Sequence, residues 1–98
     1  MQSLMPKVLQ AIAGEGYIVY AYLNDGTVRK FDMASTIQGA KPDTVWAKIS
    51  DKAVFHDTIT VLNETVAWDI AGGRNVRKCI DIDPCSIQEW PEVKDPLE

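Results

Sequence analysis

The sequence predicts an α+β fold: an antiparallel, hairpin-built sheet with short helices packed on one side. In the stretch 58–70, β-branched and aromatic residues recur at every second position on both sides of the polar turn Asn63-Glu64. Asp25-Gly26 stands between two apolar runs, which is the strongest short signal for a hairpin. The segments between these hairpins are short and have helical spacing. We expect the hairpin at 58–70 at the centre of the sheet.

Length and charge limit the possible classes of protein. The 98 residues predict one domain, 1–98, with a core from 6 to 90 and loose termini at 1–5 and 92–98. A net charge of −4 argues against a nucleic-acid binder that depends on phosphate contacts. No apolar run approaches the roughly 20 residues of a membrane span, and the first residues lack the pattern of a signal peptide. We therefore expect a cytoplasmic protein without a membrane segment.

The first hairpin sets the predicted faces of the sheet. Strands are expected at 7–13, 17–23 and 27–32, with a glycine-containing turn at 14–16. With Asp25-Gly26 as a two-residue loop, the cross-strand pairs are Leu23 with Val28, Tyr22 with Arg29, and Tyr20 with Phe31. Tyr20, Tyr22, Arg29 and Phe31 then share one face, while another loop length would flip one strand relative to the other.

Helical segments are expected between and after the hairpins. A helical turn is predicted at 34–39, a helix at 44–49 with Val45, Trp46 and Ile49 on one face, and a second turn at 51–56 capped by Ser50.

The C-terminal part is expected to be extended at 76–82 and then helical. Asp83 is a predicted cap and Pro84 the first helical residue, Ile87 and Trp90 share the apolar face, and Pro91 ends the helix before a frayed tail.

Four motifs in order then suggest a family. They are Asn24-Asp-Gly-x-Val-Arg-x-Phe31-Asp32, Asp51-x-x-Val54-Phe55, Val66-x-Trp68-Asp69 and Asp81-x-Asp83-Pro84. Over roughly residues 6–90 this succession resembles the domain of unknown function 2442 family. The resemblance implies a small bacterial α+β domain without an established activity. Its members are often encoded beside another small domain, as in toxin–antitoxin pairs. Some relatives carry a helix-turn-helix DNA-binding segment, for which we expect no room in this chain.

Two clusters could carry catalysis or bind a metal. Cys79, Asp81, Asp83 and Cys85 alternate, and thiolates and carboxylates can bind metals. The alternative is that Asp83 is a helix cap, Asp81 is solvated and both cysteines are free thiols. His56 with Asp57 or Asp69 could be a base and its orienting group, with a cysteine as nucleophile. No nucleophile motif accompanies them, so we expect no catalytic residues, no metal and no cofactor.

Two further features could bind a partner. The loop 72–78 carries Arg74, Arg77 and Lys78 and could cradle a phosphate, or it is a solvated connector. The face with Tyr20, Tyr22, Arg29 and Phe31 could be core, a partner surface or a platform for stacking bases. We favour a non-catalytic protein-interaction or regulatory module that binds a protein partner or itself through these four residues. The alternatives are a small metal-dependent or hydrolytic enzyme and a weak nucleic-acid-binding module.

Overall fold

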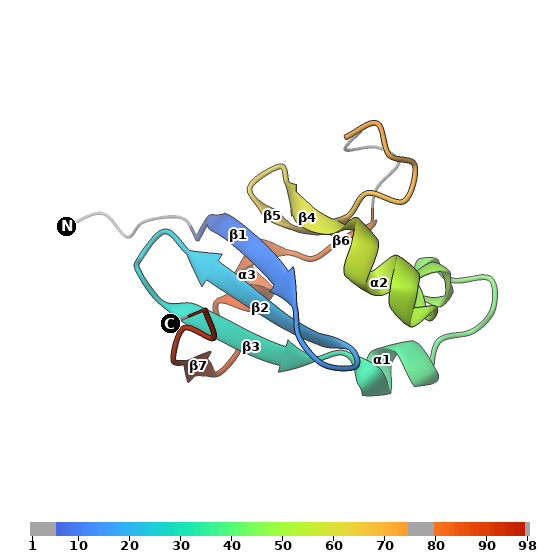
Figure 1. The fold of residues 1–98 in the computed structure, drawn as a ribbon, viewed down its shortest axis with the longest axis horizontal. Coiled ribbons are helices and arrows are strands. Elements are labelled where there is room, and N and C mark those ends of the chain that lie inside the picture. Colours follow the sequence, from blue (N-terminus) through green and yellow to red (C-terminus); the bar gives the residue numbers. More distant parts are fainter. Residues whose placement is uncertain (1–5, 75–79, 98) are drawn as a thin grey trace.

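A computed structural model describes residues 6–74 and 80–97 (Figure 1). In this part of the chain the strands form two antiparallel sheets, ordered β1-β2-β3-β7 and β4-β5-β6, and the predicted α+β class is confirmed. The expectation of a single sheet centred on the hairpin at 58–70 is wrong, because that hairpin belongs to the second sheet. The strands are β1 (Val8–Ala13), β2 (Ile18–Leu23), β3 (Val28–Asp32), β4 (Ile59–Leu62), β5 (Thr65–Trp68), β6 (Ile80–Asp81) and β7 (Glu92–Val93). The helices are α1 (Ala34–Gln38), the 3₁₀ helix η1 (Val45–Ile49), α2 (Lys52–Thr58) and α3 (Pro84–Ile87).

The first hairpin forms, but its predicted register is wrong by one residue. Tyr22 pairs with Val28 instead of Arg29, and Phe31 pairs with Val19 instead of Tyr20. The loop has three residues, 24–26, since the Leu23 N–H donates to the Thr27 carbonyl over 2.9 Å. A type I′ turn would need positive φ at both Asp25 and Gly26. Only Gly26 of the two adopts it, at 87°.

The Asp25 side chain gives a physical reason for the longer loop. Its Oδ1 accepts hydrogen bonds from the Thr27 N–H, over 2.9 Å, and from the Thr27 hydroxyl, over 2.6 Å. An aspartate that binds backbone two residues ahead stabilises its own turn geometry and competes with the ladder. Thr27 therefore closes the loop, and every residue of β3 moves to the opposite face from the one predicted.

The second hairpin packs against β1. Its turn Asn63-Glu64 has φ of 52° and 64°, and β4 and β5 pair with Ile59 opposite Trp68, as the alternation predicted. The Val8 N–H donates to the Glu64 carbonyl over 2.9 Å. A shift in register between Val8 and Gln10 marks an irregularity in β1 at this contact.

The core lies between the two sheets and the helices. Trp68 and Phe55 are fully buried, with ring centroids 5.3 Å apart, and Trp46 meets Trp68 edge-on at 6.3 Å. The Trp68 Nε1 donates to the Phe55 carbonyl, so the indole is buried without an unpaired donor. In Figure 1, α3 lies behind the four-stranded sheet and α1 and α2 gather at one end. α3 thus covers one face of the four-stranded sheet, the second sheet packs along β1, and α1 and α2 lie at one end.

The caps decide where the helices begin. The predicted cap Ser50 is replaced by Asp51, whose side chain accepts from the Ala53 N–H over 2.8 Å. The Ser50 hydroxyl instead donates to the Ala47 carbonyl. The predicted cap Asp83 is confirmed, since its Oδ1 accepts from the Cys85 N–H over 3.0 Å.

The end of the chain is more ordered than predicted. The expected frayed tail is wrong for Glu92 and Val93, which form β7 against β3. A strand of so few residues is too short to show a periodic pattern, so the sequence does not predict this pairing. The expected loose arm at 1–5 and the extended residues 76–79 lie outside the described residues.

Replacing Trp68 by alanine should lower the free energy of unfolding by about 3–5 kcal/mol, because a fully buried aromatic side chain leaves a large cavity. Urea unfolding measures the change. The control is Leu9→Ala, at a side chain that is 67% exposed, which should have little effect. An unchanged midpoint for Trp68→Ala would contradict this core.

Replacing Glu64 by glycine should raise the free energy of unfolding by about 1 kcal/mol, because its φ of 64° is strained for any residue with a Cβ. The substitution also removes the exposed Lys7–Glu64 ion pair, at 3.5 Å, which contributes less than about 1 kcal/mol. Glu64→Gln is the control, since it removes the charge and keeps the strain. If both variants lose stability equally, backbone strain at Glu64 is not the dominant effect.

Candidate functional site

The side of the four-stranded sheet that points away from the core is the candidate functional site, called the open face below. Cross-strand partners in an antiparallel sheet point the same way, so the register defines this face in rows. No helix of the described chain lies over the front of β1, β2 and β3 in Figure 1. The rows of the open face are Gln10, Tyr22, Val28 and Val93, then Ile12, Tyr20 and Lys30, then Ile18 and Asp32.

The four residues predicted to form one partner surface are divided between the two faces. Tyr20 and Tyr22 lie on the open face and are partly exposed. Arg29 pairs with the buried Ala21, and Phe31 pairs with the buried Val19, so both point to the core side. The prediction that all four share a face is wrong because it used the two-residue loop.

Arg29 and Phe31 hold the end of the α3 segment. The Phe31 ring stacks on the Trp90 ring with centroids 5.1 Å apart and planes 13° from parallel. The Arg29 Nη1 donates to the Trp90 carbonyl over 3.1 Å. These two contacts fix the point from which the chain enters β7.

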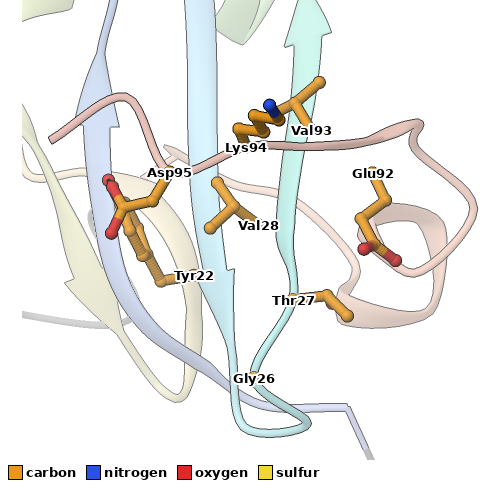
Figure 2. A pocket seen from close by; sticks show the side chains of 8 residues that line it. All are labelled: Tyr22, Gly26, Thr27, Val28, Glu92, Val93, Lys94 and Asp95. Carbon is orange, nitrogen blue, oxygen red and sulfur yellow. Dashed lines mark hydrogen bonds between the residues drawn. The ribbon is translucent and has the colours of Figure 1, made fainter. Parts of the chain in front are cut away.

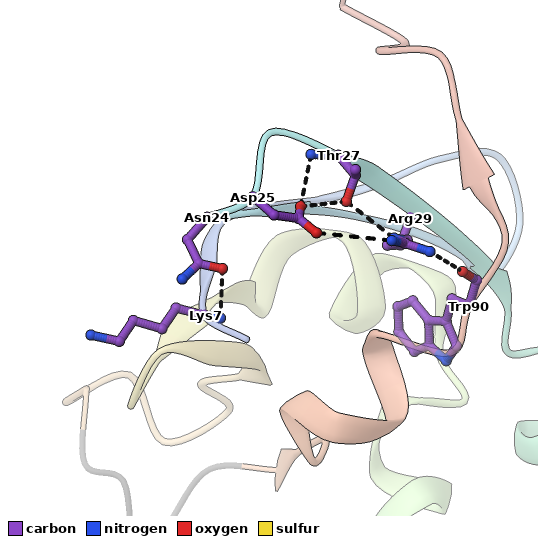
Figure 3. A network of polar contacts seen from close by, with 6 residues as sticks. All are labelled: Lys7, Asn24, Asp25, Thr27, Arg29 and Trp90. Carbon is purple, nitrogen blue, oxygen red and sulfur yellow. Dashed lines mark hydrogen bonds and ion pairs between the residues drawn. The ribbon is translucent and has the colours of Figure 1, made fainter. Parts of the chain in front are cut away.

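Figure 3 shows that Arg29 also connects this point to the first hairpin loop. Its Nε donates to the Thr27 hydroxyl over 3.1 Å, and its Nη2 lies 4.0 Å from the Asp25 carboxylate. The hydrogen bond from the Thr27 hydroxyl, with the Thr27 N–H and Arg29, lowers the pKa of Asp25 below its usual value. The loop, β3 and the Trp90 carbonyl therefore form one polar network.

The residues Glu92–Leu97, called the strap below, cross the open face. Val93 pairs with Val28, and the strap then runs over β3 and β2 with Asp95 beside Tyr22 (Figure 2). The Tyr22 hydroxyl donates to the Asp95 Oδ1 over 2.6 Å. A groove of about 650 Å³ remains between strap and sheet, lined by Tyr22, Gly26, Thr27, Val28, Glu92, Val93, Lys94 and Asp95. Tyr22, predicted to bind a partner, here binds the chain's own C-terminal segment.

Tyr20 keeps its place at the middle of the open face. A Cβ built on Gly14 would lie 2.7 Å from the Tyr20 Cε2, so this ring packs on the backbone of the turn at Gly14. Ile12 and Ile18 flank it and were not predicted as functional residues. Their alternation with buried residues could have indicated this face once the register was known.

The candidate metal ligands are not assembled. Asp83 caps α3, while Asp81 and Cys85 are exposed. Cys79 lies outside the described residues. Within the ranges 6–74 and 80–97, no group of at least three His, Cys, Asp or Glu side chains is placed to hold a metal ion.

The candidate acid–base residues have other partners. The His56 Nε2 lies 2.9 Å from the Gly16 carbonyl oxygen, and its ring packs beside Phe55. The Asp69 carboxylate accepts from the backbone N–H groups of Gly72 and Arg74. His56 is therefore used in holding the distant turn at Gly16, and Asp69 in holding the loop that follows it.

The glycine-containing loop is tied back to the second sheet where it is described. The Arg74 Nη2 donates to the Val61 carbonyl over 2.9 Å, so this guanidinium is already engaged. Arg77 and Lys78 lie outside the described residues. A second groove of about 420 Å³ beside this loop is lined by Asp57, Thr58, Ile59, Thr60, Asp69, Ile70, Gly72 and Arg74.

Comparisons with known protein families, with curated proteins and with solved structures found no match to this chain. Among the described residues, no helix has the length and apolar character needed to cross a membrane.

The Tyr22 phenol should titrate well above an ordinary tyrosine. Burial, together with the hydrogen bond to the negatively charged Asp95, raises the pKa of Tyr22 from 10.0 to about 12. Because the neutral phenol is favoured in the folded state, its contribution to stability is complete below pH 10 and is lost as the pH rises through about 12.

Ultraviolet absorbance of tyrosinate, compared between the wild type and Tyr22→Phe, isolates this titration. The Asp95→Asn variant should move the pKa of Tyr22 toward its ordinary value, because the carboxylate is removed. Titration of Tyr22 near pH 10 in the wild type would show that the bond to Asp95 does not persist in solution.

Proposed function

We propose that the protein is a non-catalytic protein-interaction module with a regulatory role, which docks a partner protein on the open face. The docking residues are Ile12, Ile18 and Tyr20. The proposal includes a cytoplasmic location and membership of the domain of unknown function 2442 family, on the four motifs that resemble it. Because members of that family are often encoded beside another small domain, we propose the product of the adjacent gene as the partner.

The observation that carries the proposal is the apolar and aromatic character of a sheet face that no described helix covers. Three neighbouring side chains of β1 and β2 are only partly buried, namely Ile12, Ile18 and Tyr20. Apolar side chains that gather on an uncovered sheet face can form an interaction surface. Tyrosine is also among the residues that most often anchor an interface.

The charges of the open face do not favour nucleic acid. Lys30 is its only cation among the strand residues described, and Asp32 stands beside it in the next row. The whole chain has a net charge of −4. Binding through stacked bases would need cations gathered beside the tyrosine rings to neutralise phosphates.

The test mixes the full chain with the product of the adjacent gene and measures the dissociation constant by calorimetry. Ile12→Lys should weaken binding at least tenfold, because it places a charge within the apolar patch, opposite Tyr20. The matched control is Leu9→Lys, on the same strand at an exposed residue outside the rows of the open face, and it should leave binding unchanged.

The salt dependence of binding distinguishes docking of a protein from binding of nucleic acid. An apolar interface should keep its affinity between low and moderate salt, whereas phosphate binding weakens steeply. Equal effects of Ile12→Lys and Leu9→Lys would place the docking surface elsewhere. Steeply salt-dependent binding of single-stranded oligonucleotides would favour the nucleic-acid function.

A further inference from the structure

We propose that the strap is a displaceable occupant of a strand-acceptor site formed by β3 and Tyr22, and that an extended acidic segment of the partner protein takes its place. The partner comes from the proposed function. The acceptor site and its chemistry are defined by the strap's own contacts.

The acceptor site combines backbone and side-chain contacts. The Lys30 N–H donates to the Pro91 carbonyl over 3.0 Å, and Val93 lies opposite Val28. Two residues further on, Asp95 accepts from the Tyr22 hydroxyl over 2.6 Å. An extended segment that adds to a sheet edge by its backbone and is selected by alternate side chains is a common mode of peptide recognition. Any segment with an apolar residue two positions before an aspartate could make the same contacts.

The strap is held weakly for a strand. β7 consists of two residues, and Pro91 has no N–H to donate to β3. The side chains of Glu92 and Lys94 are exposed, and the groove beneath the strap leaves part of it without packing. Segments with few buried contacts open locally at a small fraction of the global unfolding free energy.

The start of the strap is held firmly. Trp90 is buried, stacked on Phe31 and bound through its carbonyl by Arg29. The strap can therefore leave the open face from Pro91 onward while α3 stays in the core. A segment tethered so closely competes with a free peptide at a high effective concentration.

The site selects a segment that carries a carboxylate, because the Tyr22 hydroxyl already donates to Asp95 of the strap. Arg29 of β3 points to the core side and is bound to Asp25 and to the Trp90 carbonyl, so Lys30 is the β3 cation that faces the same side of the sheet as the strap. Lys30 lies on the open face and enters neither of the ion pairs found among the described residues. A partner segment with a carboxylate near Lys30 would gain an ion pair that the strap does not make.

The test uses a synthetic peptide with the sequence of residues 91–97, Pro-Glu-Val-Lys-Asp-Pro-Leu, and the full chain in two forms. One form is the wild type, and the other carries Val93→Asp and Asp95→Ala to release its own strap. In an NMR titration the released form should bind the peptide at least tenfold more tightly than the wild type. The shifts should centre on Tyr22, Val28 and Lys30.

Matched variants in the released form test the chemistry of the site. Tyr22→Phe should lower the affinity for the peptide severalfold, because the hydroxyl that binds the aspartate is lost. A peptide with Pro91→Glu, which places a carboxylate opposite Lys30, should bind more tightly than the strap peptide. Lys30→Glu should remove this gain, whereas Lys41→Glu, at an exposed lysine of the loop between α1 and η1, should keep it. Equal peptide affinity of the wild type and the released form would overturn the proposal, because the peptide would then bind outside the strap's site.

Hydrogen exchange in the wild type gives a second measurement if the released form does not fold. The Lys30 amide, bound to Pro91, should exchange at least tenfold faster than the amides between β2 and β3. Exchange of all these amides at one slow rate would show a strap that is a fixed part of the fold, and would overturn the proposal. The proposed function is tested separately, because Ile12→Lys should leave peptide binding intact. Failure of the strap proposal therefore does not decide the proposed function, and failure of the proposed function does not decide the strap proposal.

Discussion

The pair of hydrogen bonds from Thr27 to the Asp25 carboxylate is the contact on which the arrangement of the four-stranded sheet depends. These bonds stabilise a three-residue loop, with Gly26 in the left-handed region and Thr27 as the closing residue. A loop shorter by one residue would turn every β3 side chain to the other face. The same carboxylate reaches Arg29, so the loop that sets the register also orients the side chain that binds the Trp90 carbonyl.

The register then decides how the C-terminal segment is attached. With Phe31 and Arg29 on the core side, the Trp90 ring finds a stacking partner and its carbonyl a charged donor. With Val28 on the open face, β7 can pair beside it and the chain can cross toward Tyr22. β3 thus binds Trp90, just before the strap begins, on the core side of the sheet, while the strap itself crosses the open face. The opposite register would have separated these contacts.

This division gives the open face two parts. The part with Ile12, Ile18 and Tyr20 is partly exposed and apolar, and it is where we propose that the partner protein docks. The part with Tyr22 and Val28 lies under the strap, whose backbone and carboxylate contacts describe the segment that could replace it. A partner that contacts both parts would bury more surface than one that docks on the apolar part alone. Displacing the strap would then be coupled to docking, because one partner would contact both parts.

The sequence by itself determined the local structure. Alternation, turn residues and capping act over a few residues. They predict the α+β class, the positions of both hairpins, the Asp83 cap and the apolar face of the strand that contains Trp68. The register of β2 and β3 also depends on a local contact, because Asp25-Gly26 suits loops of two or three residues and the hydrogen bonds between Asp25 and Thr27 select the longer one. Only the tertiary structure decided that the strands form two sheets and that residues 92–97 cross the open face. These arrangements depend on contacts between residues far apart in the chain, such as Tyr22 with Asp95 and Phe31 with Trp90, for which a single sequence has no periodic signal.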